Sequence, residues 1–333
     1  MTTRIVMAIL AFSGVSQAQP SSTVVTGTYH FTTPQTAKGL QEAATIVRTV
    51  ASAPQASVDA STATLTFSGS AESVAFAAWL LPRIDRAAGD DAVYQYGLPS
   101  GDIGRIKFVP NVQTGQEMQE LLTILRVVAD VQKIFTFSSN HAMVLSGRDW
   151  QAAFSEWIID QIDQPREPKP DPTPREFTVG GPDYRGLGHG ARLNFLANVT
   201  GQRETQQVLT VLRTVGDLQK VFNYTSSHAL IFRAGDTDLE RAEWMIQNLD
   251  LPAGQSLRGA VFTAPADDDV TRIFHVLNAN PEWLATAVTG LRSELKIRQV
   301  FYTTAPATIV VRGTKGQMAE AVKWMAAQNA LFE

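Results

Sequence analysis

The sequence predicts an α+β fold built from four tandem β-α-β-β-α repeats, each a three-stranded sheet covered by two helices. Segments 117–163 and 204–250 match along their whole length at an offset of 87 residues, and such a fixed offset indicates a duplicated supersecondary unit. Three further residue types recur at matched spacing, with each glycine 21 or 22 residues after its arginine and each tryptophan 31 or 32 residues after it. The three sets are Arg48, Arg126, Arg213 and Arg292; Gly69, Gly147, Gly235 and Gly313; and Trp79, Trp157, Trp244 and Trp324.

The second repeat shows how one unit is built. Alternating apolar and polar residues at 105–109 predict a short strand, and apolar residues at three- and four-residue steps over 118–128 predict an amphipathic helix. Two strands at 133–137 and 142–145 then flank the polar turn 138–140. Asp149 is expected to cap the closing helix, whose inner face carries Phe154, Trp157, Ile158 and Ile162. A lone hairpin is marginal, so the first strand is expected to pair beside it.

The four repeats are predicted to span 23–87, 104–164, 190–251 and 270–333. Between the second and third repeats, 165–189 is predicted to be a Pro/Gly-rich linker. Five of the eleven residues from Gln164 to Pro174 are proline, a composition that favours an extended, semi-rigid spacer. The chain is therefore expected to divide into two halves of two repeats each.

The N-terminus has the pattern of an export signal. Arg4 precedes the apolar run 5–12, and Ser16-Gln17-Ala18 places small residues before a cleavage point at Gln19. We expect residues 1–18 to be a signal peptide, cleaved near Ala18 to leave a soluble periplasmic chain without a transmembrane segment. The alternative is a buried N-terminal strand. The chain has no cysteine, so its stability must come from packing rather than from disulfides.

Composition and motifs argue against several functions. Lys and Arg number 28 against 32 Asp and Glu, a net charge of −4, which does not favour a nucleic-acid partner. No catalytic, metal or cofactor constellation is recognised, so we expect no enzyme and no cofactor. His141 and His228 are interpreted as turn residues and Gly186–Gly190 as a flexible linker. The aspartates at 236, 238 and 267–269 are interpreted as helix caps and a solvated cluster rather than as a calcium loop.

The repeated tryptophans Trp79, Trp157, Trp244 and Trp324 are predicted to form the core signature of the repeat by packing against the sheet. Trp150 and Trp283 lie near predicted helix starts and are candidate interface residues. The repeated arginines lie toward the C-terminal half of their helices, where a cation complements the helix dipole. For Arg126 and Arg213 an interface role is the alternative.

Within each repeat, the hairpin and closing helix resemble the short periplasmic N-domains of the secretin family, which are NolW-like β-α-β-β-α repeats. In that family an apolar strand ends at glycine, and the next helix ends with an apolar residue followed by Asp. Asp85, Asp163 and Asp250 stand at this last place, whereas Asn329-Ala330 replaces the pair in the fourth repeat. The matching segments are 140–147 with 157–163, and 227–235 with 244–250.

The resemblance implies a periplasmic module that docks onto partners or rings. The chain has no segment resembling the large C-terminal pore domain of secretins, so a channel is not implied. We therefore expect a non-catalytic protein-interaction scaffold of a secretion or type IV pilus-like envelope machine, with other envelope proteins or a second copy as partners. The alternative is an exported binder of a small ligand or glycan, using a cleft between repeats lined by Tyr94, Tyr96, Tyr184 and Trp283. A hydrolase is the third and least favoured hypothesis.

Overall fold

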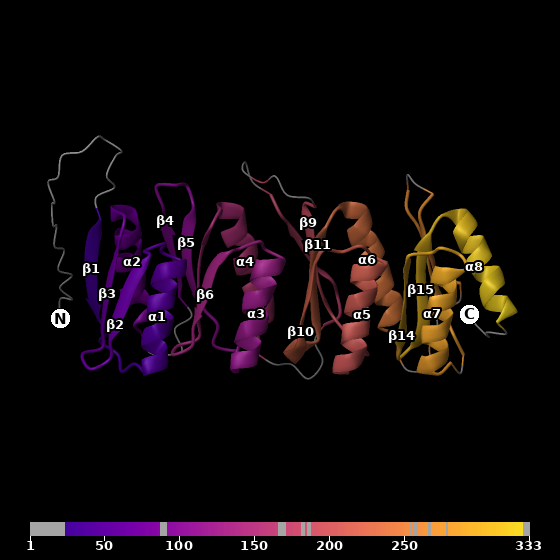
Figure 1. Ribbon diagram of the computed structural model, residues 1–333, viewed down its shortest axis with the longest axis horizontal. Helices are drawn as coiled ribbons and strands as arrows, with labels where there is room; N and C mark the ends of the chain where they lie inside the picture. The colour runs from indigo at the N-terminus through magenta and orange to yellow at the C-terminus, as the bar shows by residue number, and fades with distance from the viewer. Residues whose placement is uncertain are drawn as a thin grey trace. The chain divides into compact units, whose positions relative to one another are not determined.

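The structure is a computed structural model, which describes residues 24–86, 92–165, 171–180, 184, 188–252, 255, 259–265, 268–277 and 279–328 (Figure 1). The expected signal peptide, 1–18, lies outside the described residues. The chain divides into two compact units, the first formed by residues 1–166 with 181–183 and the second by 167–180 and 184–333. Within the described part, no helix is both long enough and apolar enough to cross a membrane.

The first unit holds two repeats. Its first repeat contains β1 (Val25–His30), α1 (Ala37–Thr49), β2 (Gln55–Asp59), β3 (Thr64–Gly69) and α2 (Ala71–Ile84). Its second contains β4 (Val93–Gly97), β5 (Ile103–Phe108), α3 (Gly115–Val127), β6 (Lys133–Phe137), β7 (Ala142–Gly147) and α4 (Asp149–Ile162). The strand orders are β1-β3-β2 and β4-β5-β7-β6, and every pairing is antiparallel.

The second unit repeats this plan. Its first repeat contains β8 (Arg175–Thr178), β9 (Gly190–Phe195), α5 (Gln202–Thr214), β10 (Lys220–Tyr224), the 3-10 turn η1 (Thr225–Ser227), β11 (Ala229–Ala234) and α6 (Asp236–Leu249). Its second contains β12 (Val261–Thr263), β13 (Val270–His275), α7 (Pro281–Ser293), β14 (Gln299–Thr304), β15 (Ala307–Gly313) and α8 (Lys315–Ala327). The strand orders are β10-β11-β9-β8 and β12-β13-β15-β14.

The predicted α+β class and the repeated β-α units are confirmed: the described residues form eight helices and four antiparallel sheets. Three strands per sheet holds only for the first repeat. The other sheets gain a fourth strand, β4, β8 or β12, from segments that the sequence indicated were connections, and β8 lies inside the predicted linker 165–189. These strands have only three to five residues and form by pairing with an existing edge, a tertiary effect that composition does not reveal.

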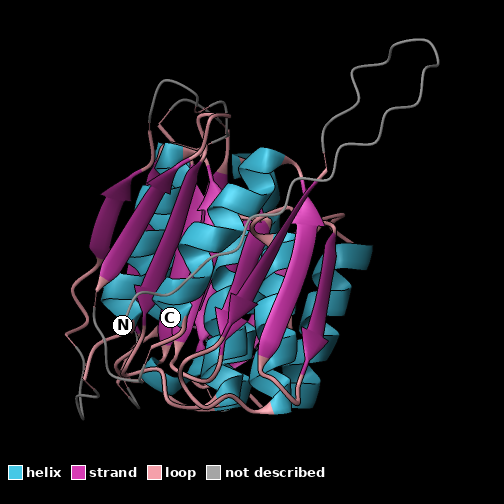
Figure 2. Cartoon of the chain, turned by 90° about the vertical axis from the view of Figure 1, so that its left-hand side faces the viewer, coloured by secondary structure: helices cyan, strands magenta, loops and turns pink. Residues whose placement is uncertain are grey.

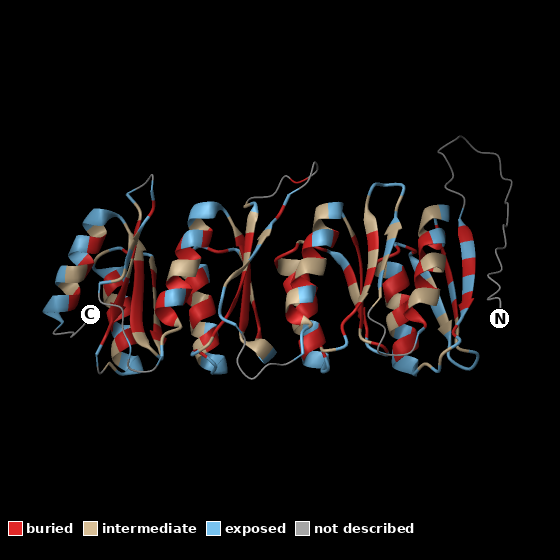
Figure 3. Cartoon of the chain, turned by 180° about the vertical axis from the view of Figure 1, so that it is seen from behind, coloured by how far each residue is buried: buried red, intermediate tan, exposed pale blue. Residues whose placement is uncertain are grey.

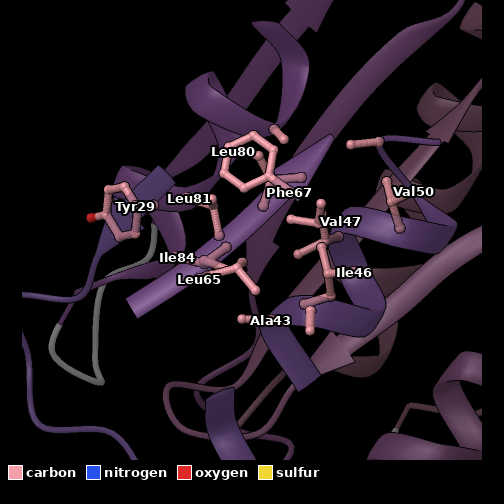
Figure 4. Close-up of a cluster of buried hydrophobic side chains, with 14 of the residues drawn as sticks. Tyr29, Ala43, Ile46, Val47, Val50, Leu65, Phe67, Leu80, Leu81 and Ile84 are labelled. Atoms are coloured by element: carbon pink, nitrogen blue, oxygen red, sulfur yellow. The ribbon is translucent and has the colours of Figure 1, made fainter. Parts of the chain in front are cut away.

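Both helices of a repeat lie on one face of its sheet (Figures 1 and 2). In the first repeat this arrangement buries Ile46 and Val47 of α1 with Leu65 of β3 and Leu80 of α2, all 0% exposed (Figure 4). The spacing of these residues follows from the helix period of 3.6 and the strand period of 2. Burying such aliphatic side chains stabilises a fold by about 1.5–3 kcal/mol each, so the first repeat has a hydrophobic core without any disulfide.

Some helices begin with a side-chain cap and others do not. Thr114 caps α3 and forms a capping box with Glu117. The closing helix α4 differs from the prediction by one residue, because its N-cap is Arg148 and Asp149 is already its first helical residue. In place of a side-chain cap, the Gln151 side chain accepts the Arg148 backbone N–H at 2.9 Å.

The aspartate that ends a closing helix fastens that helix to the loop after the first strand of its repeat. Asp85 accepts hydrogen bonds from Tyr29 Oη (2.9 Å), the Thr32 backbone N–H (2.6 Å) and the Thr33 backbone N–H (3.1 Å). Asp163 accepts from Asn111 N–H (2.7 Å), and Asp250 accepts from the three consecutive N–H groups of residues 197–199. The recurrent apolar-Asp pair is therefore a structural clamp.

Two of these aspartates differ electrostatically. Burial acts to raise the pKa of Asp85, but the hydrogen bonds donated by Thr32 and Thr33 outweigh it and lower that pKa below its ordinary value. At Asp163, burial outweighs the hydrogen bonds from Asn111 and Val112, so the pKa is raised. The charged carboxylate is therefore favoured at the first clamp and disfavoured at the second.

Candidate protein-interaction surfaces

Inside each unit, the helix pair of the first repeat packs on the sheet of the second. In unit 1, α1 packs on β6, and Glu42 accepts the Ser138 backbone N–H at 2.7 Å and its hydroxyl at 2.6 Å. In unit 2, α5 packs on β14, and Gln207 accepts the N–H and hydroxyl of Thr304, both at 2.9 Å. Because both residues precede the repeated arginine by six positions, this is one interface formed twice.

The repeated tryptophans mark the same interface. Trp79 on α2 lies 5.1 Å from the ring of Tyr96 on β4, and Trp244 on α6 lies 5.9 Å from the ring of Phe262 on β12. Both partners belong to the fourth strand of the following sheet.

All four signature tryptophans are half-buried in the structure. Trp157 stacks on Phe154 of its own helix at 5.9 Å, and the Trp324 indole N–H donates to Glu294 at 2.8 Å. The tryptophans are therefore peripheral rather than fully buried, and Trp79, Trp244 and Trp324 pack against hydrophobic core clusters. Trp79 and Trp244 also contact the sheet of the repeat that follows.

One position in this interface holds an aromatic residue in unit 1 and a charged residue in unit 2. Phe76 stacks on Tyr96 at 5.2 Å, whereas Arg241 takes the same place in unit 2, its guanidinium 5.5 Å from the Phe262 ring. Arg241 is 1% exposed and donates to Asp269 at 2.7 Å. At this position the two repeats of unit 1 are therefore joined by aromatic stacking, and the two repeats of unit 2 by a buried ion pair.

Asp269 sits between two arginines, because Arg312 on β15 also donates to it, at 2.8 Å. Burial acts to raise the pKa of Asp269, but the hydrogen bond from Arg312 and the nearby charges of Arg241 and Arg312 lower it. For Arg241, burial is the first cause of a lowered pKa and the Arg312 charge is the second. Removing one member of such a network leaves a buried charge without compensation.

In unit 2, the corresponding helix face of the second repeat, on α7 and α8, forms an open groove of about 530 Å³. Trp283, Thr286 and Gly290 of α7 line it together with Trp324 of α8. A Cβ at Gly290 would lie 2.4 Å from the Trp324 ring, so only glycine lets that ring lie against α7. Thr286 occupies the helix position at which Glu42 and Gln207 bind the next sheet, six residues before Arg292.

The candidate interface arginines act within their own repeat. Arg126 donates to the Ile134 carbonyl on β6, and Arg213 donates to the Val221 carbonyl on β10, both at 3.0 Å. Arg292 makes the same bond to Val300 of β14 at 2.7 Å. Each arginine thus occupies a carbonyl on the outer strand of its sheet. Trp150 and Trp283 are both half-buried, and only Trp283 lines the groove.

His141 and His228 occupy hairpin turns in which the backbone is left-handed, at φ 57° and 51° respectively. His141 Nδ1 lies 2.7 Å from the Val112 carbonyl oxygen. Among the described residues, no three His, Asp or Glu side chains form a potential metal cluster. Asp238 binds Arg241 at 2.7 Å, and Gly186 and Asp267 lie outside the described residues.

The tyrosines proposed for glycan binding are engaged in packing. Tyr96 lies against Phe76 and Trp79. Tyr184 is 6% exposed and donates to the Gly188 carbonyl. Tyr94 is half-buried, with the guanidinium of Arg86 5.0 Å from its ring. None of the three presents a free aromatic platform.

No protein-family model and no curated protein matches the chain. Solved structures with similarity include Aeromonas hydrophila ExeD (15% identity, 88% of this chain, 60% of that chain, TM-score 0.17) and the secretin of an ETEC pilotin–secretin AspS–GspD complex (13%, 91%, 55%, 0.17). A third is the E. coli type II secretion system secretin GspD (11%, 88%, 59%, 0.16).

The chain spans 55–60% of the length of these three chains.

Proposed function

We propose that this chain is a non-catalytic, periplasmic protein-interaction scaffold of a secretion or pilus-like envelope machine. The observation that carries the proposal is the open α7–α8 groove. Its counterpart in the first repeat of each unit is covered by the sheet of the repeat that follows. A partner with a β-sheet face of the same kind fits the groove, in continuity with the interface that the chain forms twice within itself.

Two further observations support a scaffold. The residues that recur among the repeats are structural: the aspartates clamp a helix to a loop, and the arginines bind strand carbonyls. The tyrosines that would favour the glycan-binding alternative are engaged in packing, and of the four aromatic residues proposed for it only Trp283 lines the groove. The scaffold is therefore the better-supported function of the two.

Capture of envelope proteins by the immobilised chain tests the proposal when paired variants are compared. Thr286→Arg adds bulk and charge in the groove, and Ala319→Arg adds the same group at an exposed position of α8 that does not line it. We expect a partner that is retained by the wild-type chain and by Ala319→Arg but lost with Thr286→Arg. Equal retention by all three chains, or no retained protein, would contradict the proposal.

A further inference from the structure

β1 differs from the equivalent strand of every other repeat. In the second, third and fourth sheets, the strands β5, β9 and β13 lie between the second hairpin strand and a fourth strand. In the first sheet the order is β1-β3-β2, so β1 is the outer strand. Within the described ranges, no strand pairs with its free side. The first repeat is thus the one repeat here whose sheet shows this edge open.

The three fourth strands share one register. Each places an aromatic residue opposite the same position of the strand it covers: Tyr96 opposite Gly104, Phe177 opposite Ala191, and Phe262 opposite Thr271. The position in β1 that corresponds to these three is Thr26, because Thr26 pairs with Ser68 as Gly104 pairs with Ser146. The strands β4, β8 and β12 therefore indicate the register in which a further strand would pair with β1.

The backbone of β1 is oriented to receive such a strand. The Phe31 N–H donates to Ala63 on the β3 side at 3.0 Å, and backbone direction alternates along a strand. The N–H and C=O groups of Thr26, Thr28 and His30 consequently point away from β3. All three residues are exposed, and the alternation of buried and exposed residues along β1 is visible in Figure 3.

This edge also lacks the usual protection against strand pairing. Proteins blunt exposed edges with charged side chains, proline or bulges. The outer strands β6, β10 and β14 each have a carbonyl occupied by an arginine of the preceding helix. β1, with the sequence Val-Thr-Gly-Thr-Tyr-His, contains no proline, lysine or arginine and pairs with β3 residue by residue over its six positions.

We propose that β1 binds an extended segment of a partner protein as an antiparallel fourth strand, with an aromatic residue of that segment opposite Thr26. This inference rests on the scaffold function proposed above and names the element of the partner that is recognised. Main-chain hydrogen bonds to Thr26, Thr28 and His30 supply the affinity, and the alternate side chains supply the specificity.

A peptide copied from β4 provides a defined probe. The peptide Ala-Val-Tyr-Gln-Tyr-Gly-Leu has the sequence of residues 92–98. Leu98 N–H donates to Asp102 of the β5 side at 2.9 Å, so the amides of Tyr94 and Tyr96 face the covered strand and that of Gln95 faces away. We expect the labelled peptide to bind the chain that begins at Gln19 and to slow amide exchange at Thr26, Thr28 and His30.

N-methylation supplies matched controls on the peptide. A methyl group on the Tyr96 amide removes a ladder donor and is expected to weaken binding at least tenfold, whereas the same group on Gln95 leaves it within about twofold. On the protein, Thr28→Pro removes an N–H that faces the free side and is expected to abolish binding, while Thr28→Val keeps that N–H and the binding.

The outcomes separate this proposal from the scaffold function. Absence of peptide binding to the wild-type chain, or binding that Thr28→Pro and N-methyl-Tyr96 both leave intact, overturns the β1 proposal. The scaffold function is judged independently, by the groove variant Thr286→Arg and its control. An envelope partner that is lost with Thr286→Arg but retained by Thr28→Pro keeps the scaffold and rejects β1 as its docking strand.

Discussion

Glu42 on α1 binds Ser138 just beyond β6 through both the backbone N–H and the hydroxyl, at 2.7 and 2.6 Å. The two residues belong to different repeats, 96 positions apart in the chain. Gln207 and Thr304 reproduce the contact in unit 2. In each unit, the helices of the first repeat therefore pack between two sheets, their own and that of the second repeat.

Removing this contact is expected to destabilise unit 1. Glu42→Ala deletes a charged acceptor that is 12% exposed and leaves the Ser138 N–H unbound, a loss of about 2 kcal/mol. Glu42→Gln, the residue that unit 2 uses, is expected to cost less than half as much. Urea unfolding, with hydrogen exchange to localise the change to unit 1, measures both. An equal loss of unfolding free energy for Glu42→Ala and Glu42→Gln contradicts this hydrogen-bonding role of Glu42.

The aspartate clamp predicts a pH dependence. Asp85→Asn is expected to cost about 2 kcal/mol at pH 7, because Asp85 accepts several hydrogen bonds as a carboxylate. Since its folded pKa is lowered, the stabilisation is fully present above the unfolded pKa, about 3.9. It is lost as the pH falls through the lower folded pKa. The difference between wild type and variant in urea midpoint should therefore shrink below about pH 4.

Asp163 is expected to give a pH dependence of stability opposite to that of Asp85, and it serves as a control. Its folded pKa is raised, so the folded chain binds a proton more readily than the unfolded chain does. Lowering the pH through that raised value therefore stabilises the wild type relative to Asp163→Asn. Urea midpoints of both variants, measured across pH 3–7, test the contrast. Parallel pH profiles for Asp85→Asn and Asp163→Asn are not compatible with it.

The buried network of unit 2 predicts compensation between two substitutions. Asp269→Ala removes the carboxylate shared by Arg241 and Arg312 and is expected to cost about 3 kcal/mol, because Asp238 is then the one counter-charge that the described residues place on the buried Arg241. Adding Arg241→Phe restores the residue type of Phe76 in unit 1 and should recover part of the loss. Urea unfolding of the single and double variants measures the coupling, and strictly additive costs contradict it.

The helix arginines are expected to protect sheet edges. Arg126→Ala frees the Ile134 carbonyl on β6 and should lower the urea midpoint of unit 1 by the equivalent of about 1 kcal/mol while increasing self-association. Sedimentation velocity over a concentration series measures the second effect. Thr123→Ala, on the same helix, is the control, since its hydroxyl bonds within the helix to Gln119 at 2.7 Å. Matching behaviour of the two variants rejects an edge role.

The export prediction has a direct mass test. If residues 1–18 form a signal peptide, the chain recovered from the periplasm begins at Gln19, and its intact mass lacks the first 18 residues. Ala18→Phe places a bulky residue directly before the cleavage point and is expected to leave the precursor uncut. A full-length chain recovered from the wild type, or an unchanged cleavage pattern in the variant, contradicts the prediction.

Part of the candidate site was predictable and part was not. The repeated spacing located Trp79 and Trp244 at equivalent places, but their contacts with Tyr96 and Phe262 depend on strands that the pattern did not reveal. The fourth strands have three to five residues and lie in segments that resemble connections. They become strands only because an edge is available to pair with. The hydrogen bond from Arg126 to Ile134 could have been found from the sequence. Each of Arg126, Arg213 and Arg292 bonds to the carbonyl eight residues further along the chain.

By itself, the sequence determined the α+β class and the order of elements within a repeat, because the periods of 3.6 and 2 are local properties of the chain. Only the tertiary structure decided what the outward faces do. It showed that α1 and α5 are covered by the next sheet, that α7 lines an open groove, and that β1 has a free side among the described residues. The physical reason is that such contacts join residues far apart in the chain, so no local pattern encodes them.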